Sequence, residues 1–167
     1  FPRVTFDFTT KVEHVLEHRE LMGQLREAGA TFIVSAFEST SERVLARLHK
    51  GHSVAQMEEA LTVLAEVGLA VQPTWVPFTP WTTLDDYLGM LVWIRSHGLI
   101  PSTPGVQMSI RLLVPPSSAL LDHPDVESWR GKLDAANFTW RWAHPDPRMD
   151  DLARQVARLV DAGDVVL

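Results

Sequence analysis

Short apolar runs rich in β-branched and aromatic residues alternate along this chain with longer segments whose apolar residues recur every three or four positions. The short runs predict strands at 4–8, 31–37, 69–76 and 106–114. The longer segments predict helices at about 11–28, 41–49, 54–67 and 83–97. Because regular strand–helix alternation is typical of a parallel sheet covered by helices, the predicted fold class is α/β.

Helix-boundary signals support this pattern. A Ser or Thr followed three residues later by Glu or Gln forms a capping box at 10–13, 39–42 and 53–56, and 83–86 is a related pattern with an acidic residue. Gly29, Gly68 and Gly98 each follow a predicted helix, where a left-handed backbone conformation commonly ends it. These signals place helix ends between the predicted strands.

The character of the chain changes after Pro115 and Pro116, where prolines and tryptophans become frequent. This part predicts a short strand at 138–142 and an amphipathic helix at 148–162, followed by an apolar run that begins at 164–167. We therefore divide the chain into residues 1–121 and a C-terminal extension, residues 122–167. The final run and the non-Met start at Phe1 favour a piece of a larger protein.

Composition narrows the classes of function. The chain has 167 residues, 46% hydrophobic and 22% charged, which is typical of one globular domain. A formal charge of −6 argues against broad binding to nucleic acid or anionic lipid. No apolar run approaches the roughly 20 residues that span a membrane and no signal peptide precedes Phe1, so we expect a cytoplasmic protein. Without cysteine, the chain itself has no disulfide, thiolate zinc site or ligated iron–sulfur cluster.

Candidate binding residues lie at the carboxyl ends of the predicted strands, where parallel α/β folds bind ligands. These ends carry polar or strand-terminal residues: Asp7, Glu38, Ser39, Thr74, Val76 and Arg111. Each has a structural interpretation as well. Asp7 and Ser39 would cap helices, Glu38 would face a helix dipole, and Arg111 would pair with a surface carboxylate.

Several segments in this order resemble a radical S-adenosylmethionine (radical SAM) enzyme. The resemblance rests on Glu38-Ser39-Thr40-Ser41, Lys50-Gly51-His52-Ser53, the helix that ends before Gly68, and the segments 80–86 and 111–120. It covers residues 3–121 and implies strands three to six of a partial (β/α) barrel. It is closest to cobalamin-associated or tail-bearing members of the superfamily.

The resemblance also implies roles for individual residues. Asp7 would hold the ribose hydroxyls of S-adenosylmethionine, and Thr74 and Val76 would meet ribose and adenine. Glu38 and Ser39 would contact the methionine amino and carboxylate ends, and Lys50 would pair with that carboxylate; Arg111 opens the segment similar to the sixth strand. Phe78 departs from the family by replacing a glycine, and Trp75 and Trp81 would crowd the same mouth.

The activity implied is reductive cleavage of S-adenosylmethionine by a [4Fe–4S] cluster, giving a 5′-deoxyadenosyl radical that attacks a small-molecule or peptide substrate. A reductant such as flavodoxin or ferredoxin would supply the electron, and use of cobalamin is left open. Because this chain lacks cysteine, the cluster ligands would lie outside it, in a C-x-x-x-C-x-x-C motif upstream of Phe1. This piece alone would be inactive.

Two alternatives remain at this stage. His14, Glu17 and His18 match the H-x-x-E-H pattern of zinc hydrolases, which would need a further ligand. The chain would otherwise be a non-catalytic α/β interaction domain. His49 and His52 flank Lys50, but no neighbouring carboxylate in the sequence makes either a base.

Overall fold

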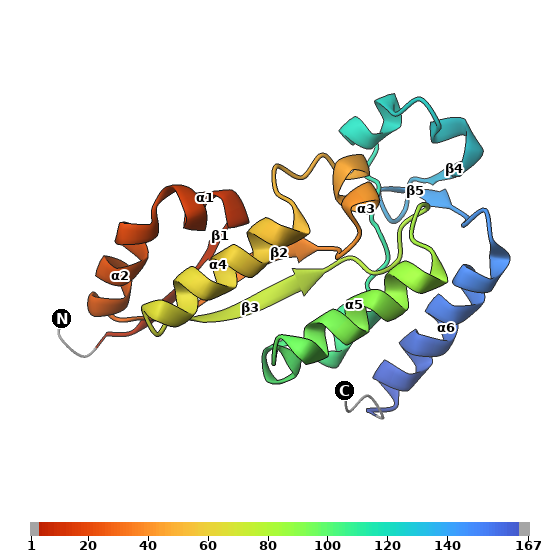
Figure 1. Ribbon diagram of the computed structural model, residues 1–167. Helices are drawn as coiled ribbons and strands as arrows, with labels where there is room; N and C mark the ends of the chain where they lie inside the picture. Colours follow the sequence, from red (N-terminus) through yellow and green to blue (C-terminus); the bar gives the residue numbers. More distant parts are fainter. Residues whose placement is uncertain (1–3, 164–167) are drawn as a thin grey trace.

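Three of the four predicted strands form one parallel sheet in the computed structural model, which describes residues 4–163 (Figure 1). The strands are β1 (Phe6–Thr10), β2 (Ala30–Glu38) and β3 (Ala70–Trp75), in the order β1-β2-β3. The α/β fold class is therefore confirmed in its coarser form, a mixed α/β fold with a three-stranded parallel sheet.

Helices connect these strands and follow the predicted segments closely. They are α1 (Val12–Glu17), α2 (Arg19–Glu27), α3 (Glu42–Arg47), α4 (Val54–Glu66) and α5 (Leu84–Ser96). The prediction of one continuous helix over 11–28 is wrong, because His18 (φ −123°, ψ 43°) interrupts it. This break lets Val12 and Val15 of α1 and Met22 of α2 all enter the same core.

The predicted fourth strand, 106–114, is also wrong. Its first half is a 3₁₀ helix (Gly105–Ser109) that follows another at Ile100–Ser102, and strand pairing is limited to one bridge between Phe78 and Arg111. At the free edge of β3 a side chain takes the place of a neighbouring strand as hydrogen-bond acceptor. The Trp75 N–H donates to Gln107 Oε1 at 2.9 Å. Burial of Met108 in the core draws the segment out of strand geometry.

The core lies on one face of the sheet. Ile33 and Phe37 of β2 and Val71 and Trp75 of β3 pack with apolar residues of α1, α2, α4 and α5, which cover this face. An aromatic cluster sits at its centre, where Trp75 meets Phe37 and Trp93 edge to face at centroid distances of 5.7 and 5.8 Å. The alternate residues of β2 and β3 point to the other face and are less buried.

Two of the predicted helix caps are confirmed and two are wrong. Ser53 Oγ accepts the Gln56 N–H and Gln56 Oε1 accepts the Ser53 N–H, and Thr83 and Asp86 do the same at the start of α5. At the starts of α1 and α3 no side chain caps the helix. Glu13, assigned to the first box, contacts a different part of the chain.

The Ser53→Ala variant is expected to lower the free energy of unfolding by about 1 kcal/mol, because the Ser53 hydroxyl accepts the Gln56 N–H at the α4 N-terminus and alanine cannot. For a chain of this size the melting temperature should fall by about 2–4 °C, measured by circular dichroism. Thr62→Ala, at an exposed position of the same helix, is the control and should change it little. Equal shifts in the two variants would contradict the capping role.

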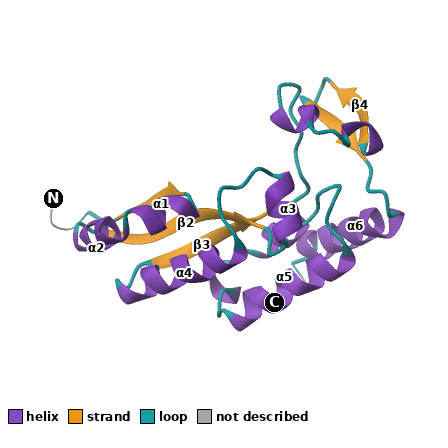
Figure 2. Ribbon diagram, turned by 45° about the horizontal axis from the view of Figure 1, so that its top comes forward, coloured by secondary structure: helices purple, strands orange, loops and turns teal. Residues whose placement is uncertain are grey.

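The C-terminal part forms a small second cluster beside the sheet. Two 3₁₀ helices (Ala119–Asp122 and Val126–Ser128) precede an antiparallel hairpin of β4 (Arg130–Asp134) and β5 (Thr139–Trp142), which stands apart from the parallel sheet in Figure 2. The predicted strand and helix are confirmed, since α6 spans Pro147–Asp161. The apolar run at 164–167 lies outside the described residues.

Each of the two apolar clusters contains residues from both sides of the predicted division at residue 121. Val44 and Trp81 pack with Val114 and Trp129, whereas Met149 of α6 joins the main core. The division after residue 121 stays a prediction. Across residues 4–163 no helix has the length and apolar character needed to cross a bilayer.

Candidate functional site

Glu38 and Lys50 form an ion pair at the carboxyl end of β2, with 2.7 Å between Glu38 Oε1 and Lys50 Nζ. Glu38 is the last residue of the strand, and Lys50 lies in the loop between α3 and α4. Figure 1 shows this loop near the end of β2. Their side chains are 14% and 29% exposed. A carboxylate and an ammonium group are therefore held side by side where this fold class binds ligands.

The backbone turns sharply at Glu38, at the end of β2. Glu38 has a positive φ of 66°, and the register between β2 and β3 shifts between Ala36 and Glu38. The Glu38 carbonyl accepts the Val76 N–H at 2.9 Å, and the Ser39 N–H donates to the Phe37 carbonyl at 2.8 Å. A left-handed conformation at a non-glycine residue is uncommon and costs free energy, which the surrounding hydrogen bonds offset.

Ser39 supports the turn from within. It is 6% exposed, and its Oγ accepts the Ser41 N–H at 3.1 Å. The hydroxyl thus fixes the entry to α3 rather than capping it at the N-cap position, which Ser41 occupies. Its contact with a ligand stays a prediction.

Two further predicted residues lie next to the ion pair. Thr74 is paired with Ala36, two residues before Glu38, and Val76 donates its N–H to Glu38. Both are partly exposed, in contrast to Trp75 between them. The strand alternation therefore places Thr74 and Val76 on the face of the sheet that the helices leave open.

Asp7 is not brought to this end of the sheet. It pairs with Phe32 near the start of β2, whereas β1 continues to Thr10. Six residues separate Phe32 from Glu38, which corresponds to roughly 20 Å along a strand. The side chain is exposed, and its assigned contact with ribose stays a prediction.

Arg111 contacts the C-terminal part of the chain. Its Nη1 lies 2.8 Å from Asp150 Oδ1, its Nη2 donates to the Trp142 carbonyl at 3.0 Å, and its guanidinium stacks on the Trp142 ring at 3.6 Å. These contacts link β5 and α6 to the segment that follows the 3₁₀ helix. A ligand role for Arg111 stays a prediction.

The aromatic residues expected to crowd the mouth are placed elsewhere. Trp75 is 1% exposed and lies in the core, and Phe78 is 2% exposed and stacks on Tyr87 at 5.1 Å. Trp81 belongs to the second cluster, where its indole N–H donates to Asp125 Oδ2 at 3.2 Å. These three side chains pack in the two apolar clusters of the fold.

One carboxylate beside the site was missed in the sequence. Glu13 Oε2 lies 3.7 Å from Nδ1 of His52, two residues after Lys50. No sequence pattern places a carboxylate beside His52, and the fold brings Glu13 there. The capping-box pattern hid this contact, because it assigned the Glu13 side chain to the start of its own helix.

The zinc alternative finds no support in the described residues. His14 and His18 lie with ring centroids 6.5 Å apart, at the end of α1. Across residues 4–163 no group of three potential ligands could hold a metal ion. Nor does the chain fit a thiolate-held iron–sulfur cluster, since its sequence has no cysteine.

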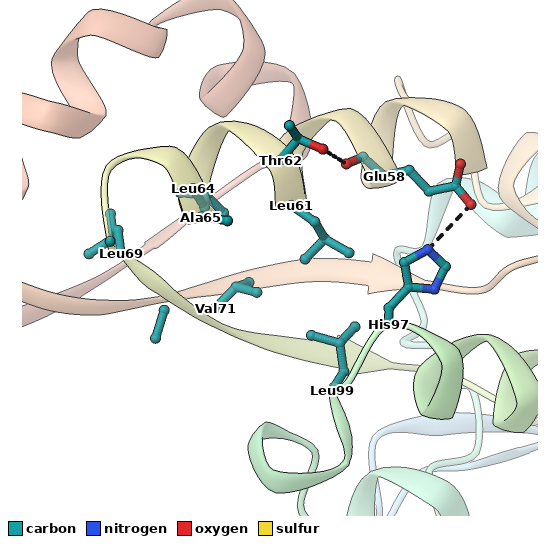
Figure 3. Close-up of a pocket in the computed structure, with 11 residues that line it drawn as sticks. Glu58, Leu61, Thr62, Leu64, Ala65, Leu69, Val71, His97 and Leu99 are labelled. Carbon is teal, nitrogen blue, oxygen red and sulfur yellow. Dashed lines mark hydrogen bonds and ion pairs between the residues drawn. The ribbon is translucent and has the colours of Figure 1, made fainter.

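A groove of about 730 Å³ lies at the opposite end of β3 (Figure 3). Apolar side chains from α4 and from the chain after α5 line it, and Glu58 Oε1 lies 3.5 Å from His97 Nε2 at its rim. Its strand residues, Ala70 and Val71, begin β3. The groove is therefore separate from the Glu38–Lys50 end.

Comparison with solved structures relates this fold to a known enzyme. The chain is similar to the cobalamin-dependent S-adenosylmethionine radical enzyme OxsB with aqua-cobalamin bound, with a TM-score of 0.80 and 14% identity over 96% of this chain. The fold is that of part of OxsB. OxsB with aqua-cobalamin and S-adenosylmethionine bound also gives 0.80, and its apo form gives 0.79.

The similarity to OxsB is limited in the length it covers and in sequence identity. This chain spans 29% of the OxsB chain, and at 14% identity the similarity establishes the fold alone. No family model matches the sequence, and no curated protein matches it. The relation to a radical SAM enzyme is therefore structural, and a partial barrel is not established by it.

Proposed function

We propose that this chain is part of a radical SAM enzyme and supplies the contacts that hold the methionine end of S-adenosylmethionine. The observation that carries the proposal is the Glu38–Lys50 ion pair at the end of β2. The OxsB fold supports it, since OxsB is known with S-adenosylmethionine bound. The three strands would be consecutive strands of a larger barrel.

The pair is complementary to an amino acid. The methionine part of S-adenosylmethionine carries an ammonium and a carboxylate on one carbon, so Glu38 would accept from the ammonium and Lys50 would donate to the carboxylate. On binding, Glu38 would exchange the Lys50 ammonium for the ligand ammonium, and Lys50 would exchange the Glu38 carboxylate for the ligand carboxylate. No charge is left unpaired, which limits the cost of burying the ligand.

Neighbouring residues would shape the rest of the site. Thr74 and Val76 flank the pair on the open face and would contact the nucleoside part. Ser39 would hold the turn in place. A [4Fe–4S] cluster held outside this chain would supply the electron for cleavage of S-adenosylmethionine. Use of cobalamin is suggested by the resemblance to cobalamin-associated members and by the similarity to OxsB.

Isothermal calorimetry on the complete enzyme tests the proposal. Lys50→Ala and Glu38→Gln are each expected to weaken S-adenosylmethionine binding about tenfold, since a charge-assisted hydrogen bond contributes roughly 1.5–3 kcal/mol and tenfold corresponds to about 1.4 kcal/mol. Lys132→Ala, at an exposed lysine of β4, is the matched control and should bind normally.

Two results would overturn the proposal. Unchanged affinity in both site variants would exclude the pair from the binding site. Absence of any ligand-dependent rise in melting temperature in the wild-type enzyme would favour the non-catalytic interaction domain instead.

A further inference from the structure

His52, in the loop that carries Lys50, contacts residues of β2 and α1. The His52 side chain is 2% exposed, and each of its ring nitrogens lies near an oxygen atom of another segment. Nε2 lies 3.4 Å from the Phe37 carbonyl oxygen, and Nδ1 lies 3.7 Å from Glu13 Oε2. The ring therefore lies between the Phe37 carbonyl of β2 and the Glu13 carboxylate of α1.

These contacts act close to the Glu38–Lys50 pair. Phe37 directly precedes Glu38, and His52 follows Lys50 by two residues. The contact between His52 and Phe37 therefore ties the two chain segments together one or two residues away from the two charged side chains. It limits how far Lys50 can move relative to Glu38.

Glu13 adds a second contact to the same loop. A Cβ atom at Gly51 would meet the Glu13 carboxylate, so this carboxylate lies close against the loop backbone. The Lys50 N–H donates to the Leu45 carbonyl at 3.0 Å, and His49 has a positive φ of 53°. The backbone on both sides of Lys50 is thus constrained.

We propose that Glu13 and His52 are positioning residues that hold Lys50 in the orientation needed for the ligand carboxylate. This inference rests on the proposed function. Neither residue contacts the ligand; both act through the loop from Leu48 to Ser53. Holding the ammonium group in place before binding reduces the ordering cost of the complex and therefore raises affinity.

A double-mutant cycle measured by calorimetry on the complete enzyme tests the proposal. His52→Ala is expected to weaken S-adenosylmethionine binding about tenfold in the wild-type background and less than about twofold in the Lys50→Ala background. Glu13→Ala should behave in the same way. His52→Gln should recover part of the affinity, since its amide can donate to the Phe37 carbonyl.

His49→Asn is the matched control, because His49 is exposed in the same loop and asparagine tolerates a positive φ. It should leave affinity unchanged. Equal losses from His52→Ala in both backgrounds would show that His52 acts independently of Lys50 and would overturn the proposal, as would no loss at all. His52→Gln provides the comparison if His52→Ala does not fold.

Amide hydrogen exchange separates this proposal from the proposed function. Exchange at the Lys50 amide should be at least about tenfold faster in His52→Ala than in the wild type, whether or not a ligand is present. Unchanged exchange would overturn the positioning role. Faster exchange in an enzyme that does not bind S-adenosylmethionine would refute the proposed function and the effect on affinity, while leaving His52 as a structural fastening of the loop.

Discussion

The Trp75→Ala variant is expected to lose about 4 kcal/mol of the free energy of unfolding. The indole is 1% exposed and packs edge to face with Phe37 of β2 and Trp93 of α5, so its removal leaves a cavity between sheet and helix. At about 2–4 °C per kcal/mol, the melting temperature should fall by about 8–16 °C in a calorimetric scan.

Two further variants serve as comparisons for Trp75→Ala. Trp75→Phe retains an aromatic ring in the cluster and should cost less, about 1–2 kcal/mol. Val92→Ala removes an apolar side chain that is 68% exposed on α5 and should change stability by less than about 0.5 kcal/mol. If Trp75→Ala proved as mild as Val92→Ala, the buried aromatic cluster would be contradicted.

The Asp125→Ala variant is expected to lose about 3 kcal/mol, because this carboxylate joins the second cluster to α3. Asp125 accepts the indole N–H groups of Trp81 and Trp129, both at 3.2 Å, and forms an ion pair with Arg47. A buried donor left without its acceptor costs about 1–3 kcal/mol. The melting temperature should therefore fall by about 6–12 °C. Asp122→Ala, at an exposed carboxylate nearby, should have little effect.

The contribution of Asp125 also depends on pH. Burial raises its pKa, but hydrogen bonds from Trp129 and His123 and the positive charges of His123 and Arg47 outweigh this effect and lower the pKa below 3.8. The stabilisation is therefore fully present above about pH 4 and is lost as the pH falls through the folded-state pKa. The difference in melting temperature between wild type and Asp125→Asn should shrink between about pH 5 and pH 2; a constant difference would contradict the role of the charge.

The location of the candidate site could be predicted from the sequence more fully than its contacts. The apolar run of β2 ends at Glu38, which identifies the strand end, and the helix that begins after Ser53 identifies the loop of Lys50. That the two side chains contact each other was not evident. Glu13 and His52 are far apart in sequence. Local sequence patterns concern near neighbours, so they do not predict that these two residues lie close together.

The sequence by itself determined the local elements of this protein. The periods of two and 3.6 residues, the Ser53 cap and the glycines after α2, α4 and α5 depend on interactions between near neighbours, which any chain with these residues can form. Tertiary packing decided the rest. The alternation in 106–114 suits a strand, yet burial of Met108 and the bond from Trp75 to Gln107 make its first half a 3₁₀ helix. His18 interrupts its helix for the same kind of reason, since the stability gained by filling a shared core exceeds the local preference of the segment.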